Sequence, residues 1–348
     1  MPTFPELFDT FRAHKDLTYD QAAWAMDQIM TDKVPAAQIA GFLMALATKG
    51  ETAEEIRGLA DRMQALALKA DLPSDVLDIV GTGGDGLKTA NISTTAAMVL
   101  AAMGVPVVKH GNRATTSASG SADVMEALGI DLYSDPHDVE KLFNSLGITF
   151  LFANVFHPAM RFVAPVRRAL GYPTAFNILG PLTNPAHPRA SAVGVAMEEA
   201  APVVAGVFAG RGSDALVFRG ATTRLDEMSP ADLNQVWEIH DGEVSRLDFD
   251  AQTIGIAPCD VNDLRGGDAA FNARIIRDIF DGQAGPVADA VALNVAAGLI
   301  AYNRTEGCRV GDGSFADRMA HGVELARQTI ASGKARQLME EWAAFGVA

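Results

Sequence analysis

The sequence predicts an α/β protein with a small all-helical domain and a larger domain whose mainly parallel central sheet is flanked by helices. Residues 1–72 show only helical patterns, whereas short apolar segments alternate with helical segments from residue 73 onwards. Such alternation indicates a parallel sheet that is covered on both faces. A length of 348 residues is sufficient for two domains, which we expect at residues 1–72 and 73–348.

The helical domain is predicted from its start signals. Thr18-x-x-Gln21 is a capping box that opens a helix through Met30, and Thr52-x-x-Glu55 opens another. Between them, a helix is expected over Ala36–Thr48. So small a bundle cannot bury all its apolar faces alone, and it needs the rest of the chain or another subunit to cover them.

In the larger domain, short apolar runs predict the strands and the segments between them predict the helices. The strands are expected at Leu77–Val80, Pro106–Lys109, Thr149–Ala153, Ala192–Ala196 and Ala215–Arg219. The helices are expected at Thr94–Met103, Ala122–Leu128, Val139–Leu146 and Ala200–Ala209. Because ligands bind beyond the carboxyl ends of parallel strands, the loops after these strands are the candidate binding loops.

Three stretches depart from this alternation. His157-Pro158 is expected to open a helix through Leu170, and we interpret residues 157–189 as an excursion back to the helical domain. Residues 240–265 alternate polar and apolar side chains, which predicts an antiparallel ribbon at the sheet edge. The C-terminal part is helical, with helices expected at Ala269–Phe280, Pro286–Asn303, Phe315–Ser332 and Ala335–Phe345.

Composition limits the possible partners. The formal net charge of −15 argues against nucleic acid and anionic membrane surfaces as main partners. Residues 1–20 lack the apolar core of a signal peptide, and the longest apolar stretch is too short to span a bilayer. Cys259 and Cys308 have no metal-site spacing and suggest no disulfide framework. We therefore expect a cytoplasmic protein with no membrane partner.

The stretch Gly81-Thr82-Gly83-Gly84-Asp85 follows an apolar strand and precedes an Ala-rich helix. Glycines let the main chain approach a ligand closely, and successive N–H groups at a helix start form a nest for anions. A phosphate or pyrophosphate is the expected ligand. A tight turn without a ligand would give the same local pattern.

Lys109-His110-Gly111-Asn112-Arg113 follows the next strand and carries two fixed cations. The hydroxyl residues Thr115, Thr116, Ser117, Ser119 and Ser121 come directly after it. This combination suits a polyanionic, hydroxylated ligand, although a solvated polar loop is the alternative for this stretch alone. Its position beside the glycine turn favours a shared phosphate site.

Asp226-Glu227 follows another strand and precedes an expected capped helix at Ser229-Pro230. A pyrophosphate needs a divalent cation, and Mg²⁺ is typically held by one or two carboxylates plus phosphate oxygens. Ser93 and Asp85 could complete such a site. A solvated acidic pair is the alternative.

Arg167 lies near the end of the helix that follows His157. It could cap helix carbonyl groups or bind a carboxylate, and the sequence leaves both open. His110 and His157 are each candidates for a general base.

Together these motifs resemble the anthranilate phosphoribosyltransferase family. The strings that carry the resemblance are GTGGDG at 81–86, NIST at 91–94, KHGNRA at 109–114, SGSAD at 119–123, HPAM at 157–160, PVR at 165–167, FNILGPLTNPA at 176–186 and LDE at 225–227. Each string is short, but all of them in this order are highly specific, and they span nearly the whole chain.

The resemblance implies transfer of the phosphoribosyl group of phosphoribosyl pyrophosphate to the anthranilate amine, the second step of tryptophan biosynthesis from chorismate. It also implies a Mg²⁺ cofactor, the class III phosphoribosyltransferase fold and a homodimer paired through the helical domain. Lys109 would then stabilise the leaving pyrophosphate, and His110 would be the candidate base.

Residue by residue, the resemblance implies three groups of contacts. Phosphoribosyl pyrophosphate would be held by Gly81, Gly84, Asp85, Thr89, Asn91, Ile92, Ser93, Thr94, Lys109, His110, Gly111, Asn112, Arg113, Ala114, Thr115, Thr116, Ser117 and Ser121. Anthranilate would contact Gly81, Asn112 and Arg167, and Mg²⁺ would be bound by Ser93, Asp226 and Glu227.

The chain departs from the family pattern at Ala118, Asn154 and Pro173, where a basic residue, a proline and an arginine are usual. These changes concern loop charge and the hinge region more than the reaction. Two other functions are considered: a pyrimidine nucleoside phosphorylase-like enzyme of the same fold, and a non-catalytic paralogue that binds nucleic acid. The acidic pair at residues 226–227 opposes the first, and the net charge of −15 opposes the second.

Overall fold

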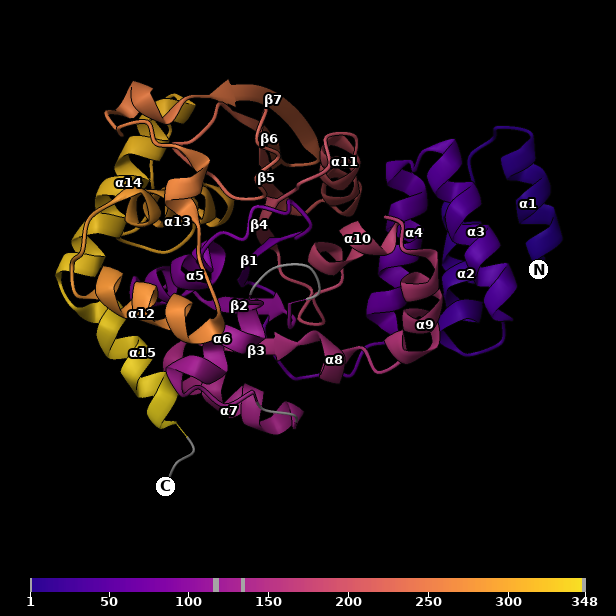
Figure 1. Cartoon of the computed structure of the whole chain (residues 1–348), viewed down its shortest axis with the longest axis horizontal. Coiled ribbons are helices and arrows are strands. Elements are labelled where there is room, and N and C mark those ends of the chain that lie inside the picture. The colour runs from indigo at the N-terminus through magenta and orange to yellow at the C-terminus, as the bar shows by residue number, and fades with distance from the viewer. Residues whose placement is uncertain (1, 115–118, 133–134, 346–348) are drawn as a thin grey trace.

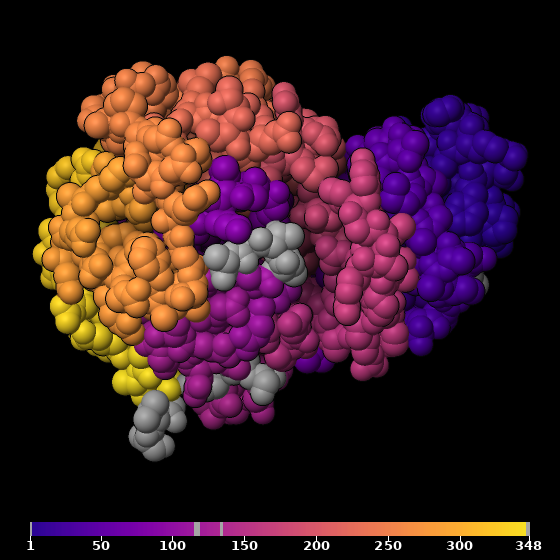
Figure 2. Space-filling view, viewed as in Figure 1, coloured from indigo at the N-terminus to yellow at the C-terminus, as the bar shows by residue number. Residues whose placement is uncertain are grey.

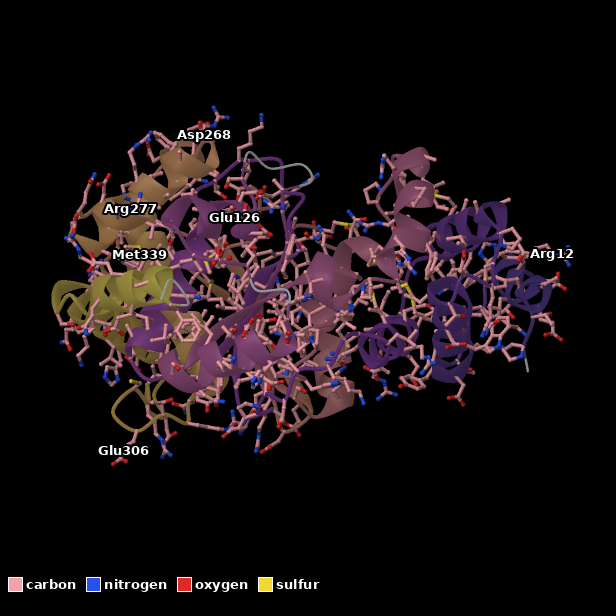
Figure 3. The ribbon with its side chains drawn as sticks, turned by 90° about the horizontal axis from the view of Figure 1, so that it is seen from below. Arg12, Glu126, Asp268, Arg277, Glu306 and Met339 are labelled. Carbon is pink, nitrogen blue, oxygen red and sulfur yellow. The ribbon has the colours of Figure 1, made fainter. Side chains whose placement is uncertain are left out.

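The computed structural model describes residues 2–114, 119–132 and 135–345. A bundle of N-terminal helices lies at one end of the molecule, and a larger body built around one sheet forms the other (Figure 1). The view turned by 90° shows the same division, with Arg12 far from Met339 (Figure 3). The predicted fold class is therefore confirmed.

The bundle consists of α1 (Phe4–Arg12), α2 (Tyr19–Met30), α3 (Ala36–Lys49) and α4 (Ala53–Ala65). Thr18 and Thr52 cap α2 and α4 through the predicted capping boxes. Later segments complete the bundle. The helix α9 (Met160–Leu170) packs against α2 and α3, and α10 (Phe176–Leu179) packs against α4.

The sheet has seven strands in the order β3-β2-β1-β4-β5-β6-β7. Their bounds are β1 Leu77–Gly81, β2 Val107–Gly111, β3 Ile148–Phe152, β4 Ala190–Gly194, β5 Asp214–Gly220, β6 Asn234–His240 and β7 Glu243–Phe249. The strands from β3 to β5 are parallel, and β6 and β7 are antiparallel. From β1 the chain builds outwards through β2 and β3, and β4 then pairs with the other edge of β1. Such a switch point opens a crevice at the carboxyl ends of the strands.

Two large cores hold the sheet between its layers of helices. One core joins one face to α5 (Ile92–Ala102), α12 (Ala269–Phe280), α13 (Pro286–Tyr302), α14 (Phe315–Ala331) and α15 (Lys334–Ala344). The other runs from the helical bundle through α11 (Ala200–Arg211) onto Val193, Val217 and Trp237. The larger domain thus covers apolar faces that the bundle cannot bury alone. The remaining helices are α6 (Ser121–Leu128), α7 (Pro136–Leu146) and α8 (Ala153–Phe156).

Three local predictions were wrong. His157 does not open α9; it ends α8 by donating its backbone N–H to Ala153 O, and α9 begins only at Met160. The antiparallel ribbon spans residues 234–249 rather than 240–265, because the later residues form short 3₁₀ turns capped by aspartates.

The third error concerns Ser229-Pro230, where the expected helix is absent. Ser229 N–H donates to Asn234 Oδ1, and Asn234 Nδ2 donates back to Ser229 O. This closed turn leads directly into β6. Within the described ranges, no helix combines the length and apolar character needed to cross a membrane.

Candidate active site

The candidate site lies where β1, β2 and β4 end in Gly81, Gly111 and Gly194, beside the switch point of the sheet. In the space-filling view, the purple part of the chain that contains the glycine turn reaches the centre of this face (Figure 2). It lies between the orange elements that follow β7 and the rose-coloured stretch around α9. The site therefore faces both domains.

The segment at residues 225–227 crosses directly over the ends of β1 and β4. A Cβ on Gly81 would lie 2.3 Å from Asp226 Oδ2, and one on Gly194 would lie 1.7 Å from the backbone O of Asp226. At Gly194 the neighbour is backbone, so only glycine fits there, whereas a Cβ at Gly81 would force the Asp226 carboxylate to move. Asp226 Oδ2 also accepts the N–H of Gly83 at 2.6 Å. The acidic pair and the glycine turn thus form one unit.

This contact refines the predicted anion nest. Gly83 and Gly84 have φ values of +69° and +86°, which are the left-handed conformations that such a turn requires. The N–H of Gly83, however, is bound to Asp226, and the N–H of Thr82 donates to Gly194 O. These two N–H groups of the turn are therefore already hydrogen-bonded within the protein and do not face an anion.

The three carboxylates of the site repel one another. Asp226 and Glu227 are both buried. Burial, followed by the nearby charges of Asp85 and Glu227, raises the pKa of Asp226 well above its usual range. Burial likewise raises the pKa of Glu227 to about 7, although Lys109 and the Ser93 N–H lower it. A group of carboxyls that resists ionisation is suited to a cation.

The residues present fit a divalent cation that shares its ligands with a substrate. Asp85 Oδ2 is buried, and no hydrogen-bond partner for it is found among the described residues. Across those residues, no three His, Cys, Asp or Glu side chains form a ready metal cage. Mg²⁺ commonly binds through one or two carboxylates together with phosphate oxygens and water, so this arrangement suits it.

Lys109, which the sequence placed at the end of a strand and the start of a polar loop, is buried at the base of this cluster. The strand β2 continues to Gly111, so Lys109 lies within the sheet, and its Nζ donates to Ile79 O at 2.5 Å. Burial lowers the pKa of Lys109, while the charges of Asp78, Glu227 and Asp226 raise it. The net result is a lowered pKa, and the amino group of Lys109 is electrostatically coupled to the acidic cluster.

His110 and His157 are buried with their ring centroids 5.2 Å apart. His110 Nδ1 lies 3.0 Å from Gly180 O, and His157 Nε2 lies 2.9 Å from Thr183 O. Burial lowers the pKa of His110 to about 3 and that of His157 to about 4. Such weakly basic rings argue against the general-base role considered for either histidine.

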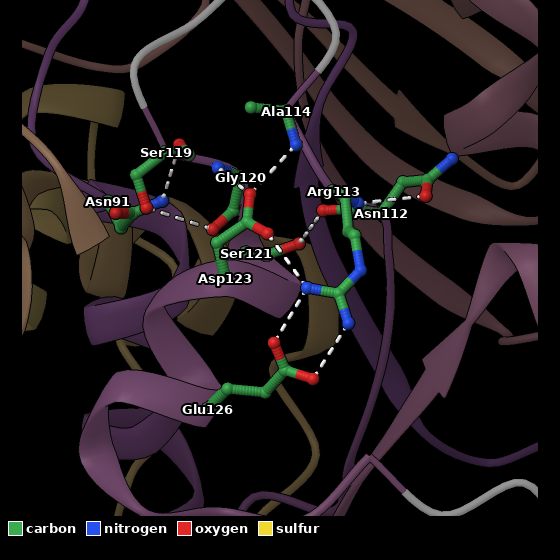
Figure 4. Close-up of polar contacts among 9 residues, drawn as sticks. All are labelled: Asn91, Asn112, Arg113, Ala114, Ser119, Gly120, Ser121, Asp123 and Glu126. Carbon is green, nitrogen blue, oxygen red and sulfur yellow. Dashed lines mark hydrogen bonds and ion pairs between the residues drawn. The ribbon is translucent and has the colours of Figure 1, made fainter.

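Arg113, a predicted donor contact, is paired with two carboxylates of α6 (Figure 4). Its guanidinium binds both carboxylate oxygens of Glu126, at 2.6 and 2.7 Å, and Asp123 Oδ1 at 3.0 Å. Asp123 Oδ2 accepts the N–H groups of Ala114 and Gly120. These contacts tie the start of the loop to α6. The predicted contacts Thr115, Thr116 and Ser117, and the departure Ala118, lie outside the described residues.

The other predicted contacts fall into two groups. Ile92 and Thr94 are buried in the first turn of α5, so only their backbone could face a ligand. Around the glycine turn and the loop, five predicted contacts are partly or fully exposed: Thr89, Asn91, Ser93, Asn112 and Ser121.

Arg167 lies in the last turn of α9, with its guanidinium 5.3 Å from the ring centroid of Phe176. Partial burial lowers the pKa of Arg167. A guanidinium in such an environment gains from a carboxylate partner.

Three further buried residues take part in the site and were not predicted from the sequence. Residue 194 must be glycine because the backbone of Asp226 passes directly over it. Asp78 and Asn184 hydrogen-bond beneath the site, with Asn184 Nδ2 donating to Asp78 Oδ2 at 2.9 Å. Asn184 could have been found only within the FNILGPLTNPA string, and nothing local marked Asp78.

Fold and site define a two-domain glycosyl transferase. The model of the "Glycosyl transferase family, a/b domain" matches residues 73–336, and that of the "Glycosyl transferase family, helical bundle domain" matches residues 5–67. Anthranilate phosphoribosyltransferase of Arthrobacter sp. (strain FB24) is 52% identical over 342 residues, which is 98% of this chain and 96% of that protein. The Rhodococcus jostii (strain RHA1) enzyme is 48% identical over 98% of this chain and 92% of its own length. This chain belongs to the anthranilate phosphoribosyltransferase family.

Solved structures of relatives support the same family assignment. The crystal structure of anthranilate phosphoribosyltransferase from Thermus thermophilus matches with a TM-score of 0.88 and 40% identity, covering 98% of this chain and 99% of that one. The Saccharomyces cerevisiae enzyme in complex with PRPP and Mg matches with a TM-score of 0.85 and 28% identity, covering 97% and 96%. These relatives favour this family over the nucleoside phosphorylase-like and nucleic-acid-binding alternatives.

Proposed function

We propose that this chain transfers the 5-phosphoribosyl group of phosphoribosyl pyrophosphate to the amine of anthranilate and releases pyrophosphate. The observation that carries the proposal is the crossing of Asp226-Glu227 over the glycine turn, which unites a phosphate-binding turn with carboxylates for a cation. Relatives named for this reaction support it at 52% and 48% identity over nearly the whole chain.

On the donor side, the glycine turn, the first turn of α5, the end of β2 and residues 112–114 hold phosphoribosyl pyrophosphate. Asp226 and Glu227, with Ser93 and Asp85 beside them, hold Mg²⁺. The yeast relative in complex with PRPP and Mg supports this assignment. When bound, the cation neutralises charge that develops on the leaving pyrophosphate. Lys109 lies beneath the carboxylates and lowers the pKa of Glu227, which favours its ionised form.

On the acceptor side, Arg167 binds the carboxylate of anthranilate, and Gly81 and Asn112 contact the ring. A yeast relative in complex with 4-fluoroanthranilate supports an aromatic acceptor in this family. The anthranilate amine is already neutral, so the weakly basic histidines need not deprotonate it before attack. Catalysis then rests on positioning and electrostatics.

We also infer that two copies pair through the helical domain. Phe8 and Trp24 of the bundle remain only partly buried in the single chain, which supports an apolar contact there. Sedimentation velocity tests the inference, and a monomer at micromolar concentration would contradict it.

A fluorescence assay tests the proposed reaction. Purified protein with phosphoribosyl pyrophosphate, Mg²⁺ and anthranilate should deplete anthranilate fluorescence, and omission of either the donor or Mg²⁺ should prevent the loss. Persistent fluorescence alongside an active relative used as a positive control would reject the proposal.

Arg167→Ala is expected to raise the KM for anthranilate by at least tenfold, because a charge-assisted bidentate contact contributes about 1.5–3 kcal/mol. The KM for phosphoribosyl pyrophosphate should change less than twofold. Initial rates over both substrate concentrations measure the split. Arg168→Ala, at an exposed neighbouring position, is the matched control. An equal rise of both KM values would contradict the role given to Arg167.

A further inference from the structure

Asn184 connects the two domains from a fully buried position. Its backbone O accepts a hydrogen bond from Gln64 Nε2 on α4 of the helical bundle. Its side-chain Nδ2 donates to Asp78 Oδ2 at 2.9 Å and to Val108 O at 2.8 Å, both in the sheet. A single residue therefore bonds to the bundle with its main chain and to the sheet with its side chain.

Asp78 extends this connection to the active site. Its side chain is completely buried, and its Oδ1 accepts the backbone N–H of His110 at 3.1 Å. His110 follows Lys109 near the carboxyl end of β2, which leads into the loop assigned to the donor. Gln64, Asn184 and Asp78, here called the interdomain relay, thus form a continuous hydrogen-bonded chain from the bundle to that loop.

Packing around the relay is incomplete. A cavity of ≈ 320 Å³ lies at the amino ends of β4 and β5, lined by Gln64 and Asn184 together with residues of α4 and α11. Arg211 Nε donates to Asp61 Oδ1 across the same cavity at 2.8 Å. Because side chains do not fill this part of the interface, the hydrogen bonds of the relay add directional constraints to the apolar contacts between the bundle and α11.

The relative position of the two domains matters for the proposed reaction, because the residue assigned to the acceptor carboxylate and the residues assigned to the donor belong to different domains. Arg167 lies on α9, which packs against α2 and α3 of the bundle, whereas Lys109 and His110 belong to β2. The amine must lie within about 3–3.5 Å of the ribose carbon that it attacks, and an error of about 1 Å can cost a factor of 100 in rate.

We propose that Gln64, Asn184 and Asp78 are positioning residues that set the distance between the acceptor-binding helix α9 and the donor-binding end of β2. The inference rests on the proposed function. None of the three needs to touch a substrate, so their loss should lower kcat and leave both KM values nearly unchanged.

Gln64→Leu tests the relay by removing the donor to Asn184 O beside a cavity that can accept the change. We expect kcat to fall on the order of tenfold, with each KM within about twofold of wild type. Arg62→Gln is the matched control, because Arg62 lies on the same helix but binds Asp27 within the bundle. It should lower thermal stability without lowering kcat. An unchanged kcat in Gln64→Leu, or an equal fall in the control, would overturn the proposal.

A second measurement does not depend on activity. Hydrogen exchange of the peptide that contains the His110 amide should accelerate at least threefold in Gln64→Leu and remain at the wild-type rate in Arg62→Gln. Unchanged exchange in Gln64→Leu would overturn the relay even if wild-type protein is active. Inactive wild-type protein with accelerated exchange in the variant would instead reject the proposed function and leave the relay supported.

A double-mutant cycle separates a relay from three independent structural contacts. Asp78→Asn places an amide donor opposite the donor of Asn184 and breaks the next connection. If the residues act as a unit, adding Gln64→Leu to Asp78→Asn should lower kcat less than twofold further. If the fold-loss of kcat in the double variant equals the product of the losses in the two single variants, the residues act independently and the proposal is contradicted.

Discussion

Gly194→Ala is expected to lower kcat/KM by at least about 100-fold. The new Cβ would lie 1.7 Å from the backbone O of Asp226, and backbone is the least compliant neighbour available. Residues 225–227 must therefore move away from the ends of β1 and β4, which displaces both carboxylates from the glycine turn. Misplacement of catalytic groups by about 1 Å is sufficient for such a loss. Initial rates with saturating Mg²⁺ measure the change.

Gly180→Ala is the matched control for this substitution. A Cβ on Gly180 would meet nothing within 4 Å, and its φ of −51° is open to any residue. This variant should retain activity within about twofold of wild type.

Overpacking in Gly194→Ala should also lower the free energy of unfolding by about 1–3 kcal/mol, which thermal denaturation measures. Wild-type rates in Gly194→Ala would contradict the tight crossing on which the site is built.

The secondary structure was predictable wherever the signal is local. The capping boxes at Thr18 and Thr52 place the starts of α2 and α4 because the residues that form them are only three apart in the sequence. The strand, glycine turn and helix around Gly81 are likewise encoded in consecutive residues. The order of the strands is not, because it depends on the pairing of β1 with both β2 and β4.

The site was predictable in its residue types but not in their contacts. The predicted strand ended at Lys109, whereas pairing with β3 extends β2 to Gly111. Arg113 was expected to contact the donor, but Asp123 and Glu126 on α6 bind it. That pairing becomes visible only when the loop folds back onto the helix. Asp78 binds groups 32 and 106 residues away, which a local pattern cannot reveal.

The buried position of Glu227 predicts a conflict between stability and activity. In the folded, metal-free protein the pKa of its carboxyl is raised to about 7, whereas an unfolded chain titrates near the ordinary value of 4.5. The stability contribution of the group is therefore complete below pH 4.5 and is lost as the pH rises through 7. The loss is on the order of 3 kcal/mol at pH 8, since each pKa unit corresponds to about 1.4 kcal/mol.

Glu227→Gln should remove this loss because the amide cannot ionise. At pH 8 without Mg²⁺, the variant is expected to melt several degrees higher than wild type, and the two should converge below pH 5. Glu198→Gln, at an exposed position, is the control and should melt like wild type at both pH values. Differential scanning calorimetry in the presence of EDTA measures the difference.

The same substitution should lower the rate with saturating substrates at least about 100-fold, because a neutral amide binds Mg²⁺ weakly and cannot offset its charge. Mg²⁺ should raise the melting temperature of wild type more at pH 8 than at pH 6, since protons compete with the cation for Glu227. In the variant this pH dependence should shrink. Retained activity would contradict the metal-binding role of Glu227. An unchanged melting temperature at pH 8 would contradict the raised pKa of its buried carboxyl.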